Sequence, residues 1–282
     1  MSGMKATLFK SAAVEKLKGI YDDQEARNVI SLLIEVRIGK GALRSDRPLE
    51  PEEIRQLEND LVRLTACEPV QYVLERAWFH DLQLKVNPAV LIPRPETEEL
   101  VMWILEDLEG RPAQLLDIGT GSGAIAIMLA HRLQQSVVWA TDISEAALQT
   151  AGRNALDNNC SVHFLHDDIL ASQLPGRLPV LDVIVSNPPY IPEREATYMH
   201  ANVLEWEPHQ ALFVPNEDPL MYYKAIIALS PVLLKPQGTL YFEIHEQMET
   251  DLYDLVDNTI WHQPDFRRDL QGKKRMMRLR IR

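Results

Sequence analysis

From about residue 113, short apolar runs alternate along the chain with segments of helical periodicity. The apolar runs are too short for buried helices, and we expect strands at 115–118, 137–140, 162–165, 180–185 and 239–244. Helical spacing of apolar residues lies between these runs, at 124–133, 145–156 and 220–234. Such an alternation predicts a doubly wound α/β domain with a mostly parallel sheet.

The first part of the chain has a different pattern, which favours helices alone. Apolar residues recur at helical spacing over 24–36 and again after Pro51, and no strand is expected before about residue 70. We therefore expect a separate helical domain over residues 1–77 that docks a partner, followed by a connecting strand or hairpin at 78–92. Thr97 is then expected to cap a helix with Glu98 and Glu99 in its first turn.

Composition and charge exclude several classes of protein. With 46% hydrophobic and 25% charged residues in 282, the chain has ordinary globular composition. No apolar run approaches about 18 residues and no secretory signal is visible, so we expect no membrane span. Cys67 and Cys160 form neither a disulfide framework nor a zinc site, and the histidines lack metal-ligand spacing, which favours a reduced, cytoplasmic setting without metal. Residues 86–272 carry 10 Lys/Arg against 27 Asp/Glu, a poor supply for gripping nucleic acid.

A glycine-rich turn follows the expected strand at 115–118. The motif D-I-G-T-G-S-G at 117–123 places three glycines where a strand turns into a helix, and there they let the backbone approach a ligand. Asp142 lies 19 positions after Gly123, at the end of the next expected strand, where a carboxylate suits ribose hydroxyls. Because Gly119, Gly121 and Ala124 also fit the dinucleotide pattern, the glycines alone leave two cofactor classes open.

The tetrapeptide Asn187-Pro188-Pro189-Tyr190 follows the expected strand at 180–185. It resembles the S-adenosylmethionine methyltransferases that act on planar, weakly basic nitrogens. The Asn187 side-chain oxygen and the Pro188 carbonyl can accept the two N–H bonds of such a nitrogen, while Tyr190 offers a flat wall. Since proline has no backbone N–H, the rim stays rich in acceptors, and the held nitrogen can attack the sulfonium methyl in line.

A further acidic position follows the expected strand at 162–165. Asp168, or in its place Asp167, lies where strand ends line a ligand crevice, and a carboxylate there can accept the adenine amino group. An exposed acidic turn is an equally good interpretation of these two residues alone. Ile169 is then placed to pack against the adenine ring.

Further motifs along the chain carry a narrower resemblance. They are E-P-V-Q-Y at 68–72, L-I-P-R-P-E-T-E at 91–98, E-P-x-x-A-L at 207–212, E-I-H-x-Q at 243–247 and D-L-x-G-K-x-R at 269–275. Together with the glycine turn and Asn187–Tyr190, this set resembles the HemK/PrmC family, the peptide chain release factor glutamine methyltransferases, over about residues 20–282. For Arg94 and Glu96, surface charges and a loop near the active-site mouth are both open interpretations.

The resemblance implies a class I S-adenosylmethionine-dependent methyltransferase fold. This would be a Rossmann-like α/β domain with a seven-stranded, mostly parallel sheet over residues 93–282, preceded by a small helical domain that docks the release factor. The implied reaction moves a methyl group from S-adenosyl-L-methionine to N5 of the glutamine in a Gly-Gly-Gln motif, leaving S-adenosyl-L-homocysteine and supporting translation termination. The implied catalytic residues are Asn187, Pro188, Pro189 and Tyr190. The implied cofactor-binding residues are Asp117, Gly119, Thr120, Gly121, Ser122, Gly123, Asp142, Asp168, Ile169 and Asn187.

Three alternative functions are compatible with parts of the pattern. An adenine-N6 methyltransferase of nucleic acid shares the four-residue chemistry, but the central charge and the lack of an inserted base-reading domain count against it. A nicotinamide-dependent oxidoreductase would leave Asp117 and Asn187–Tyr190 without a role. The intact Asn187–Tyr190 set also disfavours a non-catalytic cofactor-binding scaffold. We expect no membrane contact and no direct sequence-specific contact with nucleic acid.

Overall fold

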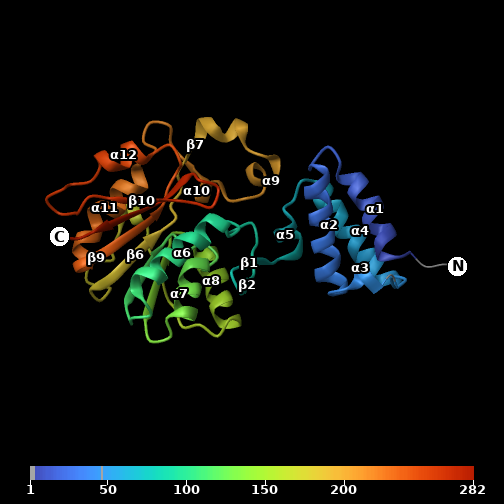
Figure 1. Cartoon of the computed structure of the whole chain (residues 1–282), viewed down its shortest axis with the longest axis horizontal. Helices are drawn as coiled ribbons and strands as arrows, with labels where there is room; N and C mark the ends of the chain where they lie inside the picture. Colours follow the sequence, from blue (N-terminus) through green and yellow to red (C-terminus); the bar gives the residue numbers. More distant parts are fainter. Residues whose placement is uncertain (1–3, 46) are drawn as a thin grey trace. The chain divides into compact units, whose positions relative to one another are not determined.

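The computed structural model describes residues 4–45 and 47–282, which form two compact units. The first unit extends to Arg76 and also takes in a later segment, His200–Trp206. It is helical, and its elements, labelled in Figure 1, are α1 (Ala6–Leu17), α2 (Asp23–Ile38), α3 (Ala42–Ser45), α4 (Pro51–Thr65), α5 (Val70–Leu74) and α9 (Ala201–Leu204). The described part of the chain has no strand before residue 77, as the sequence predicts.

Local sequence explains where the two longest helices of this unit begin. Asp22 caps α2 by accepting the backbone N–H groups of Gln24 and Glu25. A capping box precedes α4, in which the Glu50 and Glu53 side chains each accept a backbone N–H, and Pro51 occupies the first turn. The apolar faces of the helices meet in one core that includes Leu17, Ile30, Leu33, Leu57 and Leu64.

The segment His200–Trp206 has its own contacts within the first unit. The His200 ring stacks on Tyr21, and its Nε2 lies 3.0 Å from the carbonyl oxygen of Ile20. The Trp206 indole N–H donates to the carbonyl oxygen of Ala66 at 3.3 Å. A stretch that lies between β7 and β8 in sequence, in the middle of the α/β part of the chain, is therefore part of the helical unit.

The second unit contains a seven-stranded sheet. Its strands are β3 (Gln114–Ile118), β4 (Val137–Asp142), β5 (His163–His166), β6 (Leu181–Ser186), β9 (Leu234–Glu243), β10 (Asp265–Arg268) and β11 (Lys274–Arg280). The order across the sheet is β10-β11-β9-β6-β3-β4-β5. The pairs from β9 to β5 are parallel, whereas β10 pairs antiparallel with β11, and β11 pairs antiparallel with β9. The predicted mostly parallel, seven-stranded sheet is confirmed.

Helices cover both faces of this sheet (Figure 1). One hydrophobic core joins it to α6 (Pro95–Leu108), α7 (Ala124–Arg132) and α8 (Glu145–Asp157), and the other joins it to α11 (Met221–Leu233) and α12 (Glu249–Asp254). The adjacent residues Leu115 and Leu116 of β3 lie in different cores, because successive side chains of a strand point to opposite faces. This arrangement confirms the doubly wound architecture.

Shorter elements surround the sheet. β1 (Ala77–Phe79) and β2 (Leu82–Leu84) pair antiparallel as a hairpin over residues 77–84, whereas the sequence indicated a connecting strand or hairpin at 78–92. A small two-stranded sheet joins β7 (Ile191–Pro192) to β8 (Phe213–Val214); the remaining elements are η1 (Ile169–Ala171), η2 (Glu193–Tyr198) and α10 (His209–Leu212). Within the described residues, none of the helices is both long and apolar enough to cross a membrane.

The sequence-based expectation that Thr97 caps α6 is wrong. Arg94 is the residue before the helix, and Pro95 begins it, because the fixed φ of proline suits a first helical position. Thr97 therefore lies inside the first turn and is buried. β9 also starts five residues earlier than the strand expected at 239–244, with a register irregularity opposite Leu181 and Val183 of β6.

Candidate active site

A cavity of about 430 Å³ opens at the carboxyl ends of the parallel strands. Four strands contribute to its lining: Gly119 and Gly121 follow β3, Asp142 ends β4, Asp168 follows β5 and Asn187 follows β6. β3 and β6 are neighbours in the sheet, but the chain leaves β3 toward β4 on the other side. Ligands of open α/β sheets bind at such switch points, which makes this cavity the candidate active site.

The glycines of the turn after β3 do two different things. Gly121 has a φ of +56°, and a Cβ there would meet no protein atom within 4 Å, so the turn presents open backbone to the cavity. At Gly123, with a φ of +85°, a Cβ would lie 2.8 Å from Cδ1 of Ile127 and 3.1 Å from Cβ of Ala151. Gly121 therefore faces the cavity, while Gly123 permits the close packing of α7 against α8.

Asp142 fixes the position of this turn. Its Oδ2 accepts the N–H of Gly121 at 2.8 Å, and its Oδ1 accepts the N–H of Ser144 at 2.9 Å. Burial raises the pKa of the Asp142 carboxyl, and the two backbone N–H groups lower it. Each carboxylate oxygen has a further lone pair, which a ligand hydroxyl in the cavity can use.

Asp117 lies beneath the turn and does not line the cavity. Its Oδ2 accepts the Thr120 hydroxyl at 2.6 Å and the N–H of Ala126 at 3.3 Å, whereas Oδ1 has no hydrogen-bond partner within the described ranges. Burial raises the pKa of the Asp117 carboxyl to about 7. Thr120, Ser122 and Gly123 are likewise outside the lining, so these four predicted residues shape the turn from behind.

The two acidic residues after β5 both line the cavity, together with Ile169. Asp168 precedes η1, and its Oδ1 accepts the N–H of Leu170 at 3.0 Å. The Oδ1 of Asp167 accepts the N–H of Gln173 at 3.0 Å, but its buried Oδ2 has no protein partner in the part of the chain described. A buried acceptor without a partner is costly, which marks this end of the cavity as suited to a hydrogen-bond donor.

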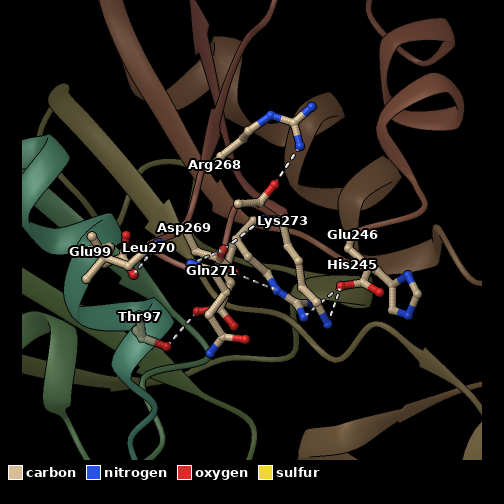
Figure 2. Close-up of polar contacts among 12 residues, drawn as sticks. Thr97, Glu99, His245, Glu246, Arg268, Asp269, Leu270, Gln271 and Lys273 are labelled. Atoms are coloured by element: carbon tan, nitrogen blue, oxygen red, sulfur yellow. Dashed lines mark hydrogen bonds and ion pairs between the residues drawn. The ribbon is translucent and has the colours of Figure 1, made fainter.

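Asn187, Pro188 and Pro189 form the opposite part of the lining, directly after β6. The Nδ2 of Asn187 donates to Oγ1 of Thr97 at 3.2 Å, across 90 positions of the chain. The Thr97 hydroxyl, which is labelled in Figure 2, in turn donates to Oε2 of Glu243 at 2.5 Å. The asparagine amide is therefore held from outside the cavity, by the first turn of α6 and the end of β9.

Tyr190 differs from the other three residues of its motif, because it does not line the cavity. Its hydroxyl donates to Oε1 of Glu243 at 3.1 Å, and its ring meets the His245 ring edge-on. Burial raises the pKa of the Tyr190 hydroxyl, and the Glu243 carboxylate raises it further. Glu243 is itself 2% exposed, and burial raises its pKa above the ordinary range of a glutamate.

The structure adds residues to which the sequence assigned no role in the active site. Thr97 and Glu243 hold the amide of Asn187, and Glu207 forms an ion pair with Arg94 while accepting the N–H of Ile92. The motifs at 91–98, 207–212 and 243–247 are the sequence signals that contain them. Their pairing joins segments 90 to 146 positions apart, which local spacing cannot reveal.

The fold and part of the chain match known methyltransferases. A sequence profile described as the Methyltransferase small domain matches residues 98–212. A solved methyltransferase from Pyrococcus furiosus superposes with a TM-score of 0.53 at 17% identity, covering 79% of this chain and 98% of that one. This similarity supports the fold of the second unit.

Curated relatives extend over nearly the whole chain. A release factor glutamine methyltransferase of Flavobacterium psychrophilum is 36% identical over 97% of this chain and 98% of its own length. One of Bacteroides thetaiotaomicron is 41% identical over 93% of this chain and 95% of its own length. With this identity over both full lengths, and with the cavity at the switch point of a methyltransferase fold, the chain belongs to the family of release factor glutamine methyltransferases.

Proposed function

We propose that this protein transfers a methyl group from S-adenosyl-L-methionine to the side-chain amide nitrogen, N5, of the glutamine in the Gly-Gly-Gln motif of peptide chain release factors. The observation that carries the proposal is that Asn187 and Pro188 line the same cavity as Gly121 and Asp142. The same cavity is therefore lined by a side chain that can bind an amide N–H and by a turn that suits a nucleoside cofactor.

The residues present fit S-adenosylmethionine, the cofactor of the family. The open backbone at Gly121 and the spare lone pairs of Asp142 suit the methionine-ribose part of the molecule. The unpartnered Oδ2 of Asp167 and the neighbouring Asp168 suit the adenine amino group, while Ile169 provides an apolar surface for the ring. When bound, the cofactor supplies a methyl group on a positively charged sulfur.

The acceptor nitrogen needs orientation more than it needs a base. An amide lone pair is delocalised into the carbonyl, so the nitrogen must be held with its lone pair facing the methyl carbon. Oδ1 of Asn187 and the carbonyl of Pro188 accept its two N–H bonds, and Pro189 adds no backbone N–H to compete. The methylated nitrogen would carry positive charge and release its proton to solvent water, so no protein base is required and positioning provides most of the rate enhancement.

The remaining parts of the proposal concern the partner and the cell. The helical unit docks the release factor, while Asn187, Pro188 and Pro189 engage the glutamine at the tip of its Gly-Gly-Gln loop. A protein that modifies translation factors works in the cytoplasm. Nucleic acid is then not a direct partner, in keeping with the 27 acidic against 10 basic residues over 86–272.

Mass spectrometry of a purified release factor tests the proposal. After incubation with this protein and S-adenosylmethionine, we expect the mass of one methylene group to be added to the peptide that contains Gly-Gly-Gln. A release factor with alanine in place of that glutamine is the matched control and gains nothing. An unmodified peptide, with cofactor binding shown by calorimetry, contradicts the proposal, and methylation of adenine in DNA or RNA would instead support the nucleic-acid alternative.

A further inference from the structure

We infer that Thr97 and Glu243 are positioning residues, which fix the orientation of the Asn187 side-chain amide so that its oxygen faces the substrate nitrogen. The inference rests on the proposed function for the identity of that nitrogen. The orientation itself follows from hydrogen bonds among residues of this chain. Neither Thr97 nor Glu243 lines the cavity, so each acts on the reaction through Asn187.

The chain of hydrogen bonds starts at Glu243, the last residue of β9. Its carboxylate is buried, and each oxygen has one hydroxyl partner: Oε2 has Thr97 at 2.5 Å, and Oε1 has Tyr190 at 3.1 Å. A carboxylate has acceptors only, so both hydroxyls must donate to it. Burial raises the pKa of the Glu243 carboxyl, while the two hydroxyl donors and, more weakly, the charge of Arg275 oppose this shift and favour the ionised form.

The direction of the first bond determines the next one. A threonine hydroxyl has a single proton, and Thr97 donates it to Glu243. The Oγ1 of Thr97 can then only accept, so the group of Asn187 that lies 3.2 Å away must be the NH₂ and not the oxygen. The other end of the Asn187 amide, Oδ1, is thereby left as the acceptor for a ligand N–H.

Without this chain of bonds, the two ends of the asparagine amide would be nearly equivalent in shape. An amide turned by 180° would present NH₂ to the substrate nitrogen, and two donors cannot hydrogen-bond each other. The misoriented form would bind no glutamine amide productively. The buried carboxylate of Glu243, which is linked to Asn187 by two successive hydrogen bonds through Thr97, thus selects the productive orientation of the Asn187 amide.

Further hydrogen bonds fix the two elements that carry this hydrogen-bond chain, the end of β9 and the N-terminal part of α6. The Tyr223 hydroxyl of α11 donates to the backbone oxygen of Glu243 at 3.0 Å. On α6, the Glu99 carboxylate accepts the N–H of Leu270 at 3.2 Å, which ties the N-terminal part of the helix to the turn between β10 and β11 (Figure 2). That turn is fixed by Asp269, whose Oδ1 accepts backbone N–H groups including that of Lys273 at 2.8 Å.

Two variants of Thr97 test the inference in the release factor assay. Thr97→Val removes the hydroxyl but keeps the branched shape, and Thr97→Ser keeps the hydroxyl. We expect Thr97→Val to lower kcat about 100-fold, the scale of a lost positioning contact, while Thr97→Ser stays within about 3-fold of the wild type. The Kd for S-adenosylmethionine and the KM for the release factor should change by less than about 3-fold in both variants.

Equal kcat for Thr97→Val and the wild type would overturn the inference, and so would an equal loss in Thr97→Ser, because a structural role would not depend on the hydroxyl. If Thr97→Val does not fold, as judged by cofactor binding, Thr97→Ala repeats the comparison.

A measurement without substrate separates this inference from the proposed function. The side-chain NH₂ signals of Asn187 can be assigned in the nuclear magnetic resonance spectrum by their absence in Asn187→Asp. We expect these protons to exchange with solvent about 10-fold faster in Thr97→Val than in the wild type, because their acceptor is lost. Unchanged exchange contradicts the chain of bonds. Faster exchange in a protein that does not methylate release factors would leave the chain of bonds intact and contradict the proposed function alone.

Discussion

The Arg94 guanidinium and the Glu207 carboxylate form an ion pair across 113 positions of the sequence, with 2.5 Å between Nη2 and Oε1. The other oxygen of Glu207 accepts the N–H of Ile92 at 3.1 Å, and the Glu207 side chain is 1% exposed. Leu91, which precedes Ile92 in the sequence, and Pro208, which follows Glu207, both line the cavity. One buried carboxylate thus joins two segments of the active-site wall and gives Arg94 a structural partner.

Removal of this carboxylate should destabilise the second unit. Glu207→Ala leaves the Ile92 N–H without an acceptor and the Arg94 charge without its partner, so we expect a loss of about 2 to 3 kcal/mol in the free energy of unfolding. Urea unfolding followed by tryptophan fluorescence measures it. The exposed pair of Glu106 and Arg267 provides the control, since Glu106→Ala should cost less than about 1 kcal/mol. Equal effects of the two variants would contradict the structural role of Glu207.

Asn187 provides the most direct test of the chemistry. Asn187→Ala removes the acceptor for the substrate N–H, and we expect kcat for release factor methylation to fall about 100-fold or more. The Cβ of alanine leaves the strand end of β6 intact, so the melting temperature should stay near that of the wild type. Single-turnover kinetics with saturating cofactor measures the effect. An unchanged rate would exclude the proposed role of Asn187.

The parts of the fold that could be predicted are those encoded in local periodicity. The strand around Leu115 and the helix after Gly123 are visible because apolar spacing changes from continuous runs to a helical repeat. Asp142 and Asn187 could be assigned to one site because each follows such a strand, and the carboxyl ends of parallel strands share one edge.

What could not be predicted depends on distant partners. The hydroxyl of Thr97 suits a helix cap in sequence, and only the packing of α6 beside β9 turns it toward Glu243 instead. Tyr190 was expected to form a wall of the substrate pocket, but its hydroxyl lies against the same buried carboxylate. The insertion of His200–Trp206 into the helical unit is equally invisible, because nothing in its composition differs from a loop.

Asp142 should control cofactor affinity. Asp142→Ala removes the acceptor of the Gly121 N–H and the lone pairs available to ribose hydroxyls, so we expect the Kd for S-adenosylmethionine to rise about 10- to 100-fold. Isothermal titration calorimetry measures it. Asp157→Ala is the control, because Asp157 ends α8 in an exposed ion pair with Lys85 and should leave the Kd unchanged. An unaltered Kd in Asp142→Ala would place the ribose elsewhere.

The buried carboxyl of Asp117 gives the second unit a specific dependence of stability on pH. Burial raises its pKa from 3.8 to about 7, so between these values the folded state binds a proton that the unfolded state has released. The contribution of Asp117 to stability therefore falls as the pH rises through this window. It is greatest below pH 3.8, the pKa of Asp117 in the unfolded chain. The difference between the folded and unfolded pKa values of Asp117 corresponds to a loss of about 4 kcal/mol in the free energy of unfolding once the pH is above 7.

Asp117→Asn isolates this contribution, because an amide keeps the shape and one oxygen for Thr120 and Ala126 but does not ionise. We expect the free energy of unfolding of the variant, relative to the wild type, to increase from pH 4 to pH 7 and then to level off. Urea unfolding of the cofactor-free protein at several pH values measures the difference, and the other titrating groups cancel in it. A difference that is constant over this range would contradict the raised pKa. It would show that Asp117 is ionised throughout, because a nearby charge or hydrogen-bond donor stabilises the carboxylate against the effect of burial.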